Sequence, residues 1–218
     1  MGSFLIPATK IISDARLVFW DFDGVIKDSV DVKSNAFEQL FLPFGNQVAK
    51  KIRQHHEANG GISRFEKMPL YLTWAGLDAT KKNIADFCTR FSAAVLDAVI
   101  GSPWVPGVLG YLEQNRQGQK FVLVTATPRN EIEIILNRLG IARYFYRVFG
   151  APMSKAEAIA DAIHDLNIIP KNALMIGDSE SDLQAAEQSG VPFLLRRTPI
   201  NRALQERYRG PQFDQFTQ

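Results

Sequence analysis

The sequence contains little cysteine and histidine, almost no net charge and no long hydrophobic run. One cysteine and three histidines occur among its 218 residues, which excludes an internal disulfide and predicts that Cys88 is a buried apolar residue in a helix. No apolar stretch reaches the ~18 residues of a membrane span, and the N-terminus lacks the basic start and apolar run of a secretory signal. We therefore expect a cytoplasmic protein with no membrane partner.

The charge is nearly balanced, with 25 Lys and Arg against 23 Asp and Glu, a net charge of +2. The most basic stretch, residues 196–209, has five arginines and one glutamate. Because aromatic residues are sparse there, we interpret it as a solvated helix face and predict no nucleic-acid partner. The remaining composition is that of an ordinary globular protein, long enough for one large domain or a core with a modest insertion.

Five short apolar runs predict buried parallel strands, because continuous hydrophobicity is required where a sheet is covered on both faces. These runs are Leu17–Trp20, Phe121–Val124, Tyr146–Phe149, Ala173–Ile176 and Phe193–Leu195. Helical apolar periodicity separates several of them, for example at positions 132, 135, 136 and 139. This alternation predicts an α/β fold with a doubly wound, mostly parallel, Rossmann-like sheet of about five strands.

The alternation has a gap, because residues 30–100 contain helical periodicity and no convincing strand. Turn-rich segments at 24–29 and 101–107 flank the gap. We therefore predict an α/β core formed by residues 1–29 and 103–218, with a helical insert over residues 30–102.

Two pairs of aspartates follow predicted strands. Asp21 and Asp23 come directly after the first strand, and their spacing on an extended chain places both carboxylates on one side. Asp178 follows the fourth strand, with Asp182 one helical turn later. The functional crevice of a doubly wound sheet lies at the carboxyl ends of its strands. Four converging carboxylates repel one another unless a cation is present, and an all-oxygen site without His or Cys favours Mg²⁺.

Phosphate chemistry also requires groups that bind the phosphate oxygens. Thr125 ends the second predicted strand, and Thr127-Pro128 predicts a helix N-cap and first turn at the same place. Ser154 and Glu157 predict a capping box, which puts Lys155 in the first helical turn, the unfavourable end of the helix dipole for a cation. A broken local rule suggests a functional residue.

In this order the motifs resemble the four motifs of haloacid dehalogenase superfamily phosphatases. Residues 19–25 (FWDFDGV) resemble the first motif, 124–125 the second, Lys155 the third and 177–182 (GDSESD) the fourth. The resemblance covers nearly the whole chain and implies that Asp21 is the nucleophile, forming an aspartyl-phosphate, and that Asp23 is the general acid/base. It implies that Mg²⁺ is held by Asp21, the backbone carbonyl of Asp23 and Asp178. Superfamily dehalogenases and ATP-driven pumps lack the second aspartate, so Asp23 favours phosphate-ester chemistry.

The helical insert resembles the small α-helical cap of the phosphoglycolate phosphatase and β-phosphoglucomutase group. Its Gly61-Ile62-Ser63-Arg64 segment resembles the loop whose arginine meets the substrate in that group, although a surface position for Arg64 stays open. His55 and His56 precede this loop and face either the substrate or a helix surface. The segment after Lys155 lacks the Pro-x-Pro common in this group, so Arg129 is a rival phosphate-binding cation.

The sequence thus predicts a Mg²⁺-dependent phosphatase that hydrolyses a small phosphorylated metabolite, a sugar phosphate or a phosphorylated acid. The alternatives are a phosphosugar mutase of the β-phosphoglucomutase type and a catalytically silent binding protein with the same fold. The expected site residues divide into three groups by role. The catalytic residues are Asp21, Asp23, Thr125 and Lys155; the substrate-binding residues are Gly24, Ser63, Arg64, Thr125 and Ala126; the metal-site residues are Asp21, Asp23, Asp178 and Asp182.

Overall fold

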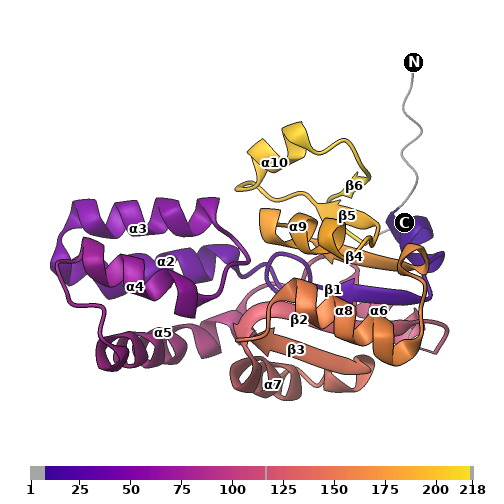
Figure 1. Ribbon diagram of the computed structural model, residues 1–218, viewed down its shortest axis with the longest axis horizontal. Helices are drawn as coiled ribbons and strands as arrows, with labels where there is room; N and C mark the ends of the chain where they lie inside the picture. Colours follow the sequence, from indigo (N-terminus) through magenta and orange to yellow (C-terminus); the bar gives the residue numbers. More distant parts are fainter. Residues whose placement is uncertain (1–7, 116, 217–218) are drawn as a thin grey trace.

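A six-stranded parallel sheet forms the centre of the α/β part of the molecule (Figure 1). The computed structural model describes residues 8–115 and 117–216. The sheet order is β3-β2-β1-β4-β5-β6. Its strands are β1 Leu17–Trp20, β2 Lys120–Pro128, β3 Arg147–Ala151, β4 Ala173–Gly177, β5 Phe193–Arg196 and β6 Gln212–Phe213. All five predicted strands are present, and the sixth was missed because it has only two residues.

The prediction of a sheet covered on both faces is confirmed. Alternate β1 residues enter different apolar clusters, with Val18 and Trp20 in one and Leu17 and Phe19 in the other. The first cluster includes helices α1 Ala8–Ser13, α6 Val108–Asn115 and α7 Arg129–Arg138. The second includes α8 Lys155–Leu166, α9 Glu180–Gln188 and α10 Arg202–Arg207. Two 3₁₀ turns, η2 Ala142–Tyr144 and η3 Pro170–Asn172, precede β3 and β4.

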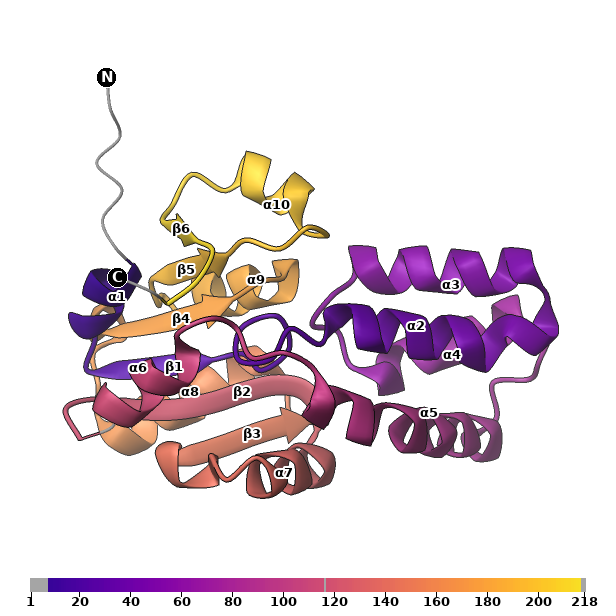
Figure 2. The same ribbon diagram turned by 180° about the vertical axis from the view of Figure 1, so that it is seen from behind.

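The predicted helical segment lies beside the sheet rather than over either of its faces (Figures 1 and 2). It consists of α2 Val30–Phe41, η1 Leu42–Phe44, α3 Asn46–Ala58, α4 Arg64–Trp74 and α5 Lys81–Gly101. We call these elements the helical insert, and their boundaries as a separate domain stay a prediction. The segments that connect the sheet to the start and to the end of the helical insert lie side by side: the Asp28 N–H donates to the Pro103 carbonyl at 2.8 Å. The insert also shares the first apolar cluster with the sheet.

Two helix starts decide how phosphate-binding residues are placed, and one was predicted wrongly. Ser154 and Glu157 do form a capping box, so Lys155 begins α8 as expected. The predicted N-cap at Thr127 is wrong, because β2 continues through Pro128 and α7 begins at Arg129 without a side-chain cap. The extended backbone leaves the Thr127 hydroxyl available to other partners.

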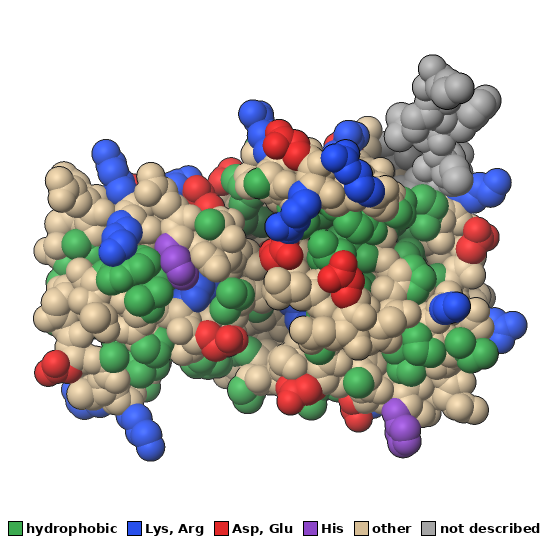
Figure 3. Space-filling model, turned by 45° about the horizontal axis from the view of Figure 1, so that its top comes forward, with side chains coloured by type: hydrophobic (Ala, Val, Ile, Leu, Met, Phe, Trp, Pro, Cys, Tyr) green, Lys and Arg blue, Asp and Glu red, His purple; other side chains and the backbone are tan. Residues whose placement is uncertain are grey.

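Three of the five arginines in the basic segment 196–209 pair with acids. Arg196 pairs with Asp28, Arg197 with Asp214, and Arg207 with Glu180. Figure 3 shows acidic side chains interspersed with basic ones over this part of the surface. The absence of a nucleic-acid partner stays a prediction, consistent with this mixed surface. Within residues 8–115 and 117–216, no helix combines the length and the hydropathy needed to cross a membrane.

Candidate active site

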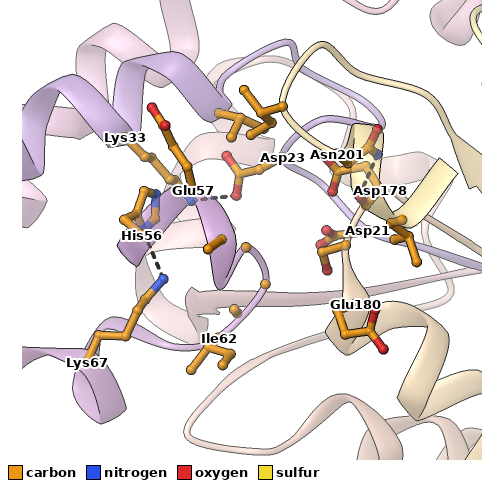
Figure 4. Close-up of a pocket in the computed structure, with 18 of the residues that line it drawn as sticks. Asp21, Asp23, Lys33, His56, Glu57, Ile62, Lys67, Asp178, Glu180 and Asn201 are labelled. Carbon is orange, nitrogen blue, oxygen red and sulfur yellow. Dashed lines mark hydrogen bonds and ion pairs between the residues drawn. The ribbon is translucent and has the colours of Figure 1, made fainter. Parts of the chain in front are cut away.

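A cavity of about 870 Å³ lies where the carboxyl ends of the strands meet the helical insert. The sheet side contributes residues that follow β1 and β4 and residues within β2, while the insert contributes residues of α2, α3, α4 and α5. Figure 4 shows Asp21, Asp178 and Asn201 on one side of it and Lys33, His56 and Lys67 on the other. The cavity therefore has an acidic wall from the sheet and a basic wall from the insert.

Three of the four predicted aspartates meet at the acidic wall. Carboxylate oxygens of Asp21, Asp178 and Asp182 lie within 4.8 Å of one another, and all three residues are buried. The strands bring them together because β1 pairs with β4 in parallel, so Asp21 and Asp178 leave adjacent strand ends. Asn201 supports this arrangement by donating to the Asp178 backbone carbonyl at 2.6 Å.

Gly24 is required where the acidic wall is tightest. It adopts φ +76°, and an added Cβ would lie 2.1 Å from a carboxylate oxygen of Asp178. Only a residue without a side chain fits both the conformation and the contact. Its carbonyl accepts a hydrogen bond at 2.9 Å from the buried Arg196. Gly24 thus lets the turn after Asp23 approach Asp178 closely, which is a different contribution from the substrate contact predicted for it.

The pKa values of the acidic wall are strongly perturbed. Burial and then repulsion from Asp182 raise the pKa of Asp21 to about 7, although Lys155 acts in the opposite direction. Burial and repulsion from Asp21 and Asp182 raise the pKa of Asp178 well above its ordinary value. Such shifts mark carboxylates that hold more negative charge than their surroundings neutralise.

Lys155 neutralises part of that charge. Its ammonium lies 3.2 Å from a carboxylate oxygen of Asp21 and 2.5 Å from one of Asp182. Burial alone would lower the pKa of Lys155, but the attraction of Asp182 and Asp21 raises it. The other oxygen of Asp182 accepts from the Ser179 N–H at 3.1 Å and from its hydroxyl at 2.5 Å. Both oxygens of Asp182 are therefore engaged, which suits a residue that positions Lys155 and the α9 start rather than one that binds a metal.

The donor set fits a divalent cation. Three buried carboxylates share one ammonium, which contacts only Asp21 and Asp182, so the cluster keeps an excess of negative charge. No histidine or cysteine joins the cluster among the residues that the structure describes. Oxygen-only ligands of this kind suit Mg²⁺.

Asp23 belongs to a separate network that turns its carboxylate toward the insert. It forms an ion pair with Lys33 of α2 and accepts hydrogen bonds from the Ser29 hydroxyl at 2.6 Å and the Thr127 hydroxyl at 3.3 Å. Burial would raise the pKa of Asp23, but Lys33 and these hydrogen bonds outweigh it and the pKa is lowered. Lys33 also donates to the Thr127 hydroxyl at 2.8 Å, so one insert cation joins two sheet-side motifs.

The second predicted motif lines the cavity, and the rival cation does not. Thr125 is buried, its hydroxyl accepts the Thr127 N–H at 3.2 Å, and Ala126 lies beside it in the cavity wall. Arg129 instead pairs with Glu133 at 2.5 Å on the outer surface of α7. Of the two cations considered for phosphate binding, the structure places only Lys155 next to Asp21.

The predicted substrate loop of the insert has other partners. The Ser63 hydroxyl caps α4 by accepting the Phe65 N–H at 3.3 Å, and Ser63 is not among the residues of the cavity wall. Arg64 does line the cavity, but two of its nitrogens bind the carboxylate of Glu131 in α7 at 2.9 and 2.7 Å. The third contact is the Ser92 hydroxyl at 2.5 Å. Arg64 therefore joins insert to core through a buried bidentate ion pair.

The two histidines before this loop differ in position. His55 is half-buried and its Nδ1 lies 3.1 Å from the Tyr71 hydroxyl, whereas His56 is buried in the cavity wall. The Nδ1 atom of His56 lies 2.8 Å from the ammonium of Lys67. His56 thus faces the cavity and His55 packs on the aromatic side chains of α4, including Trp74.

Sequence reasoning missed Lys33, Lys67 and Glu131. Two of them could have been found from helix periodicity. Lys67 falls at i+3 from Arg64 on the stripe that also contains Met68 and Tyr71, so its burial follows once α4 is placed. Glu131 likewise lies on the buried face of α7, directly before Ile132 and four positions before Ile135. Lys33 has no local signal, because its partners Asp23 and Thr127 lie in two distant segments.

Comparison with known proteins identifies the family. Residues 18–195 match the family described as haloacid dehalogenase-like hydrolase. The chain belongs to this family. The match includes Asp21, Lys155 and Asp178, which the geometry has already brought together. The resemblance and the prediction of an α/β phosphatase of this family are thereby confirmed.

Curated relatives and solved structures agree with this assignment. Phosphoglycolate phosphatase 1 of Pseudomonas aeruginosa is 29% identical over 187 residues, covering 81% of this chain and 67% of the relative. Phosphorylated carbohydrates phosphatase of Thermotoga maritima is 24% identical and covers 80% and 81%. The crystal structure of β-phosphoglucomutase from Clostridium difficile superposes with a TM-score of 0.74 at 20% identity, covering 93% of this chain and 92% of the other. At that identity the superposition establishes the fold.

Proposed function

We propose that this protein is a Mg²⁺-dependent phosphatase that hydrolyses a small phosphorylated metabolite through an aspartyl-phosphate. The observation that carries the proposal is the position of Asp21, buried at a strand end between Lys155 at 3.2 Å and Asp178. A carboxylate in this position is a suitable nucleophile when cationic groups neutralise the charge of the phosphoryl group. Bound Mg²⁺, held by Asp21, Asp178 and the Asp23 carbonyl, would supply further charge neutralisation.

The side chains supply the remaining steps. An oxygen of Asp21 attacks phosphorus in line with the ester oxygen, so the P–O bond to the alcohol breaks as the aspartyl-phosphate forms. Asp23 donates a proton to the leaving alcohol and later accepts one from the water that hydrolyses the aspartyl-phosphate. Lys155 and the Thr125 hydroxyl bind phosphoryl oxygens, while Asp182 holds Lys155 in place. Lys33 pairs with Asp23 and lowers its pKa, which favours the carboxylate form that accepts a proton from water.

Two classes of substrate agree with the relatives, a phosphorylated acid and a sugar phosphate. The relatives include proteins named phosphoglycolate phosphatase and phosphorylated carbohydrates phosphatase. A phosphosugar mutase is the second candidate, supported by the structural similarity to β-phosphoglucomutase. The silent binding protein is the weaker alternative, because Asp21, Asp23 and Asp178 are all present and line one cavity. A cytoplasmic location stays a prediction.

The test is a phosphate-release screen over phosphorylated acids and sugar phosphates with Mg²⁺, run beside Asp21→Asn and followed by an isomerisation assay. Phosphate release that the variant abolishes supports the phosphatase. Isomerisation faster than release would favour the mutase. Release that persists in Asp21→Asn would remove Asp21 from the role of nucleophile.

A further inference from the structure

The buried stripe of α4 carries two cations where an apolar stripe is usual. Its buried residues follow the helical spacing and are Arg64, Lys67, Met68, Tyr71 and Leu72. A stripe of this kind normally contains apolar side chains that pack on the rest of the protein. A buried charge is costly unless an opposite charge and hydrogen bonds compensate it. The partners of the two cations therefore show what each contributes.

Arg64 has a counter-ion and Lys67 does not. The carboxylate of Glu131 binds two nitrogens of Arg64. Lys67 is 4% exposed, and its ammonium contacts His56 Nδ1 at 2.8 Å and the Asn59 carbonyl at 3.2 Å, both neutral groups. An ammonium only donates, so Nδ1 of His56 accepts and the ring proton of the neutral imidazole lies on Nε2. Among the described residues, no carboxylate lies within ion-pair distance of Lys67.

The acids around Lys67 are bound to other cations or exposed. In the cavity wall, Asp23 pairs with Lys33 and Glu57 with Arg53, and outside it Glu131 pairs with Arg64. Glu66, next to Lys67 in the chain, is exposed. Burial and repulsion from Lys33 and Arg64 accordingly lower the pKa of Lys67 to about 7. An amine that is positively charged below about pH 7, and that has no counter-ion among the described residues, thus faces the cavity from its insert side (Figure 4).

Lys67 lies across the cavity from the acidic wall, where it can contact the part of a substrate that is remote from the reacting phosphate. Asp21 and Lys67 line the same cavity from opposite sides, with the aromatic rings of Phe37 and Phe91 also in its wall. A cavity of about 870 Å³ accommodates a molecule larger than the phosphate group itself. A substrate whose phosphate lies at Asp21 would therefore extend the rest of its structure toward Lys67.

We propose that Lys67, oriented by His56, binds a second anionic group of the substrate and so selects metabolites that carry one in addition to the reacting phosphate. The group is a compact oxyanion, a carboxylate or a further phosphate, that accepts hydrogen bonds from the ammonium and from the free N–H of His56. The inference rests on the proposed function for the position of the reacting phosphate. It assigns specificity to Lys67 instead of Arg64, whose guanidinium is occupied by Glu131.

The test measures binding without turnover. Wild-type protein with Mg²⁺ is titrated calorimetrically with phosphonocarboxylates of two to five carbons, with bisphosphonates whose phosphonates occupy both ends of the same chains, and with plain alkylphosphonates. At the chain length that spans the cavity, the second acid should tighten binding roughly tenfold or more, as expected for charge-assisted hydrogen bonds. The carboxylate and phosphonate arms distinguish the two kinds of second group.

Substitutions assign the gain to Lys67. Lys67→Met should abolish it while leaving the affinity for alkylphosphonates within about twofold. Lys67→Gln, which keeps a donor toward His56 without the charge, should also lose the gain and serves if the Met variant does not fold. Lys50→Met, on the exposed face of α3, is the matched control and should keep it.

Three results would overturn the proposal: no tightening by a second acid at any length in the wild type, a gain that survives both Lys67 variants, or an equal loss for all ligands. The proposed function fails separately. Absent phosphate release combined with the expected ligand discrimination would remove the phosphatase and keep the anion site, because phosphonates are not hydrolysed in the assay.

Discussion

The two walls of the cavity differ in the sign of their charged side chains and in how the fold positions those side chains. The sheet wall gathers the buried acids Asp21, Asp178 and Asp182 at adjacent strand ends around one lysine. The insert wall presents the half-buried cation Lys33 on α2 and the buried cations Arg64 and Lys67 on α4; of these three described residues, Lys67 alone lacks an acidic partner. Parallel pairing of β1 and β4 places the acids through the backbone itself. The insert cations depend instead on how helices rotate and pack.

With the proposed function, this difference assigns the reaction to the sheet wall and the choice of substrate to the insert wall. Chemistry common to phosphate esters belongs on the rigid sheet wall, where a small displacement would be costly. Under the proposed function, discrimination among substrates would belong on the insert, whose side chains line the part of the cavity away from Asp21. Changes to the sheet wall should therefore affect every substrate, and changes to Lys67 should affect only substrates with a second acid.

The largest effect is expected at the sheet wall. Asp21→Asn should lower turnover by about a thousandfold or more on any phosphate ester, p-nitrophenyl phosphate included, because an amide is not a nucleophile of this type. The measurement is steady-state phosphate release with circular dichroism as the folding check. The matched control is Asp86→Asn on the exposed surface of α5, which should keep full activity. Loss restricted to one substrate class would break the division between the walls.

Metal removal should act on the same wall with nearly the same effect. EDTA should abolish phosphate release and Mg²⁺ should restore it, since the excess charge of Asp21 and Asp178 is otherwise unneutralised. Ca²⁺ should restore little, because its larger and looser coordination misplaces the phosphoryl group. The check is activity across a titration of each cation into the metal-free protein. Full turnover in metal-free protein would contradict the proposed mechanism.

Breaking the ion pair between Arg64 of the insert and Glu131 of the core should have a smaller effect on activity but a large effect on stability. Arg64→Met leaves Glu131 buried and unpaired, so the free energy of unfolding should fall by about 3–5 kcal/mol. Activity on acidic and aryl substrates should decline together, because Arg64 no longer joins the insert to the core. Urea unfolding and kinetics on both substrate types measure these effects.

The double variant Arg64→Met/Glu131→Leu tests the cause, because removing both charges should restore most of the stability. A KM increase confined to acidic substrates in Arg64→Met would instead support the substrate contact that the sequence motif predicts for Arg64.

The two walls also differ in how much of each could be predicted from the sequence. The strands and the convergence of Asp21 and Asp178 were predictable, because a continuous apolar run followed by aspartate marks a strand end locally. Thr127 was misassigned because Thr-Pro is a common helix start, and only the register of β2 against β3 shows that the strand continues to Pro128.

The insert wall was harder to predict because its contacts are not local. The sequence motif singled out Arg64 for a substrate contact, but its partner in the structure, Glu131, is 67 positions away and belongs to the core. Burial of a charged residue is likewise invisible to composition, since lysine and arginine are usually exposed. Helix periodicity places Lys67 on a buried stripe only after the ends of α4 are known.

The smallest effect, and the one opposite in sign, is expected at Lys67. Its lowered pKa of about 7, against roughly 10.4 in an unfolded chain, corresponds to a cost of roughly 4 kcal/mol for the buried ammonium. Lys67→Met also loses the hydrogen bonds to His56 and the Asn59 carbonyl, which subtracts about 1.5–3 kcal/mol from the gain. Lys67→Met should therefore stabilise the protein by about 1–2 kcal/mol at neutral pH, raising the Tm by several degrees.

The pH dependence identifies the origin of that gain. The unfolded chain binds more protons at this lysine between pH 7 and 10.4, so the stability of the wild type rises with pH across this window. Below pH 7 both states are protonated and the cost is complete, so the advantage of Lys67→Met should be largest there and shrink as pH rises.

The charged and titratable groups around Lys67 are His56, Lys33, Arg64, Glu66 and Asp23. Because Lys67 lowers the pKa of His56, the titration of His56 does not cancel in the difference between wild type and variant, and the comparison is made above pH 7. Urea unfolding of both proteins from pH 7 to 10 measures this difference. A variant less stable than the wild type at every pH would show that Lys67 is a structural residue, and the insert wall would then lose its role in selection.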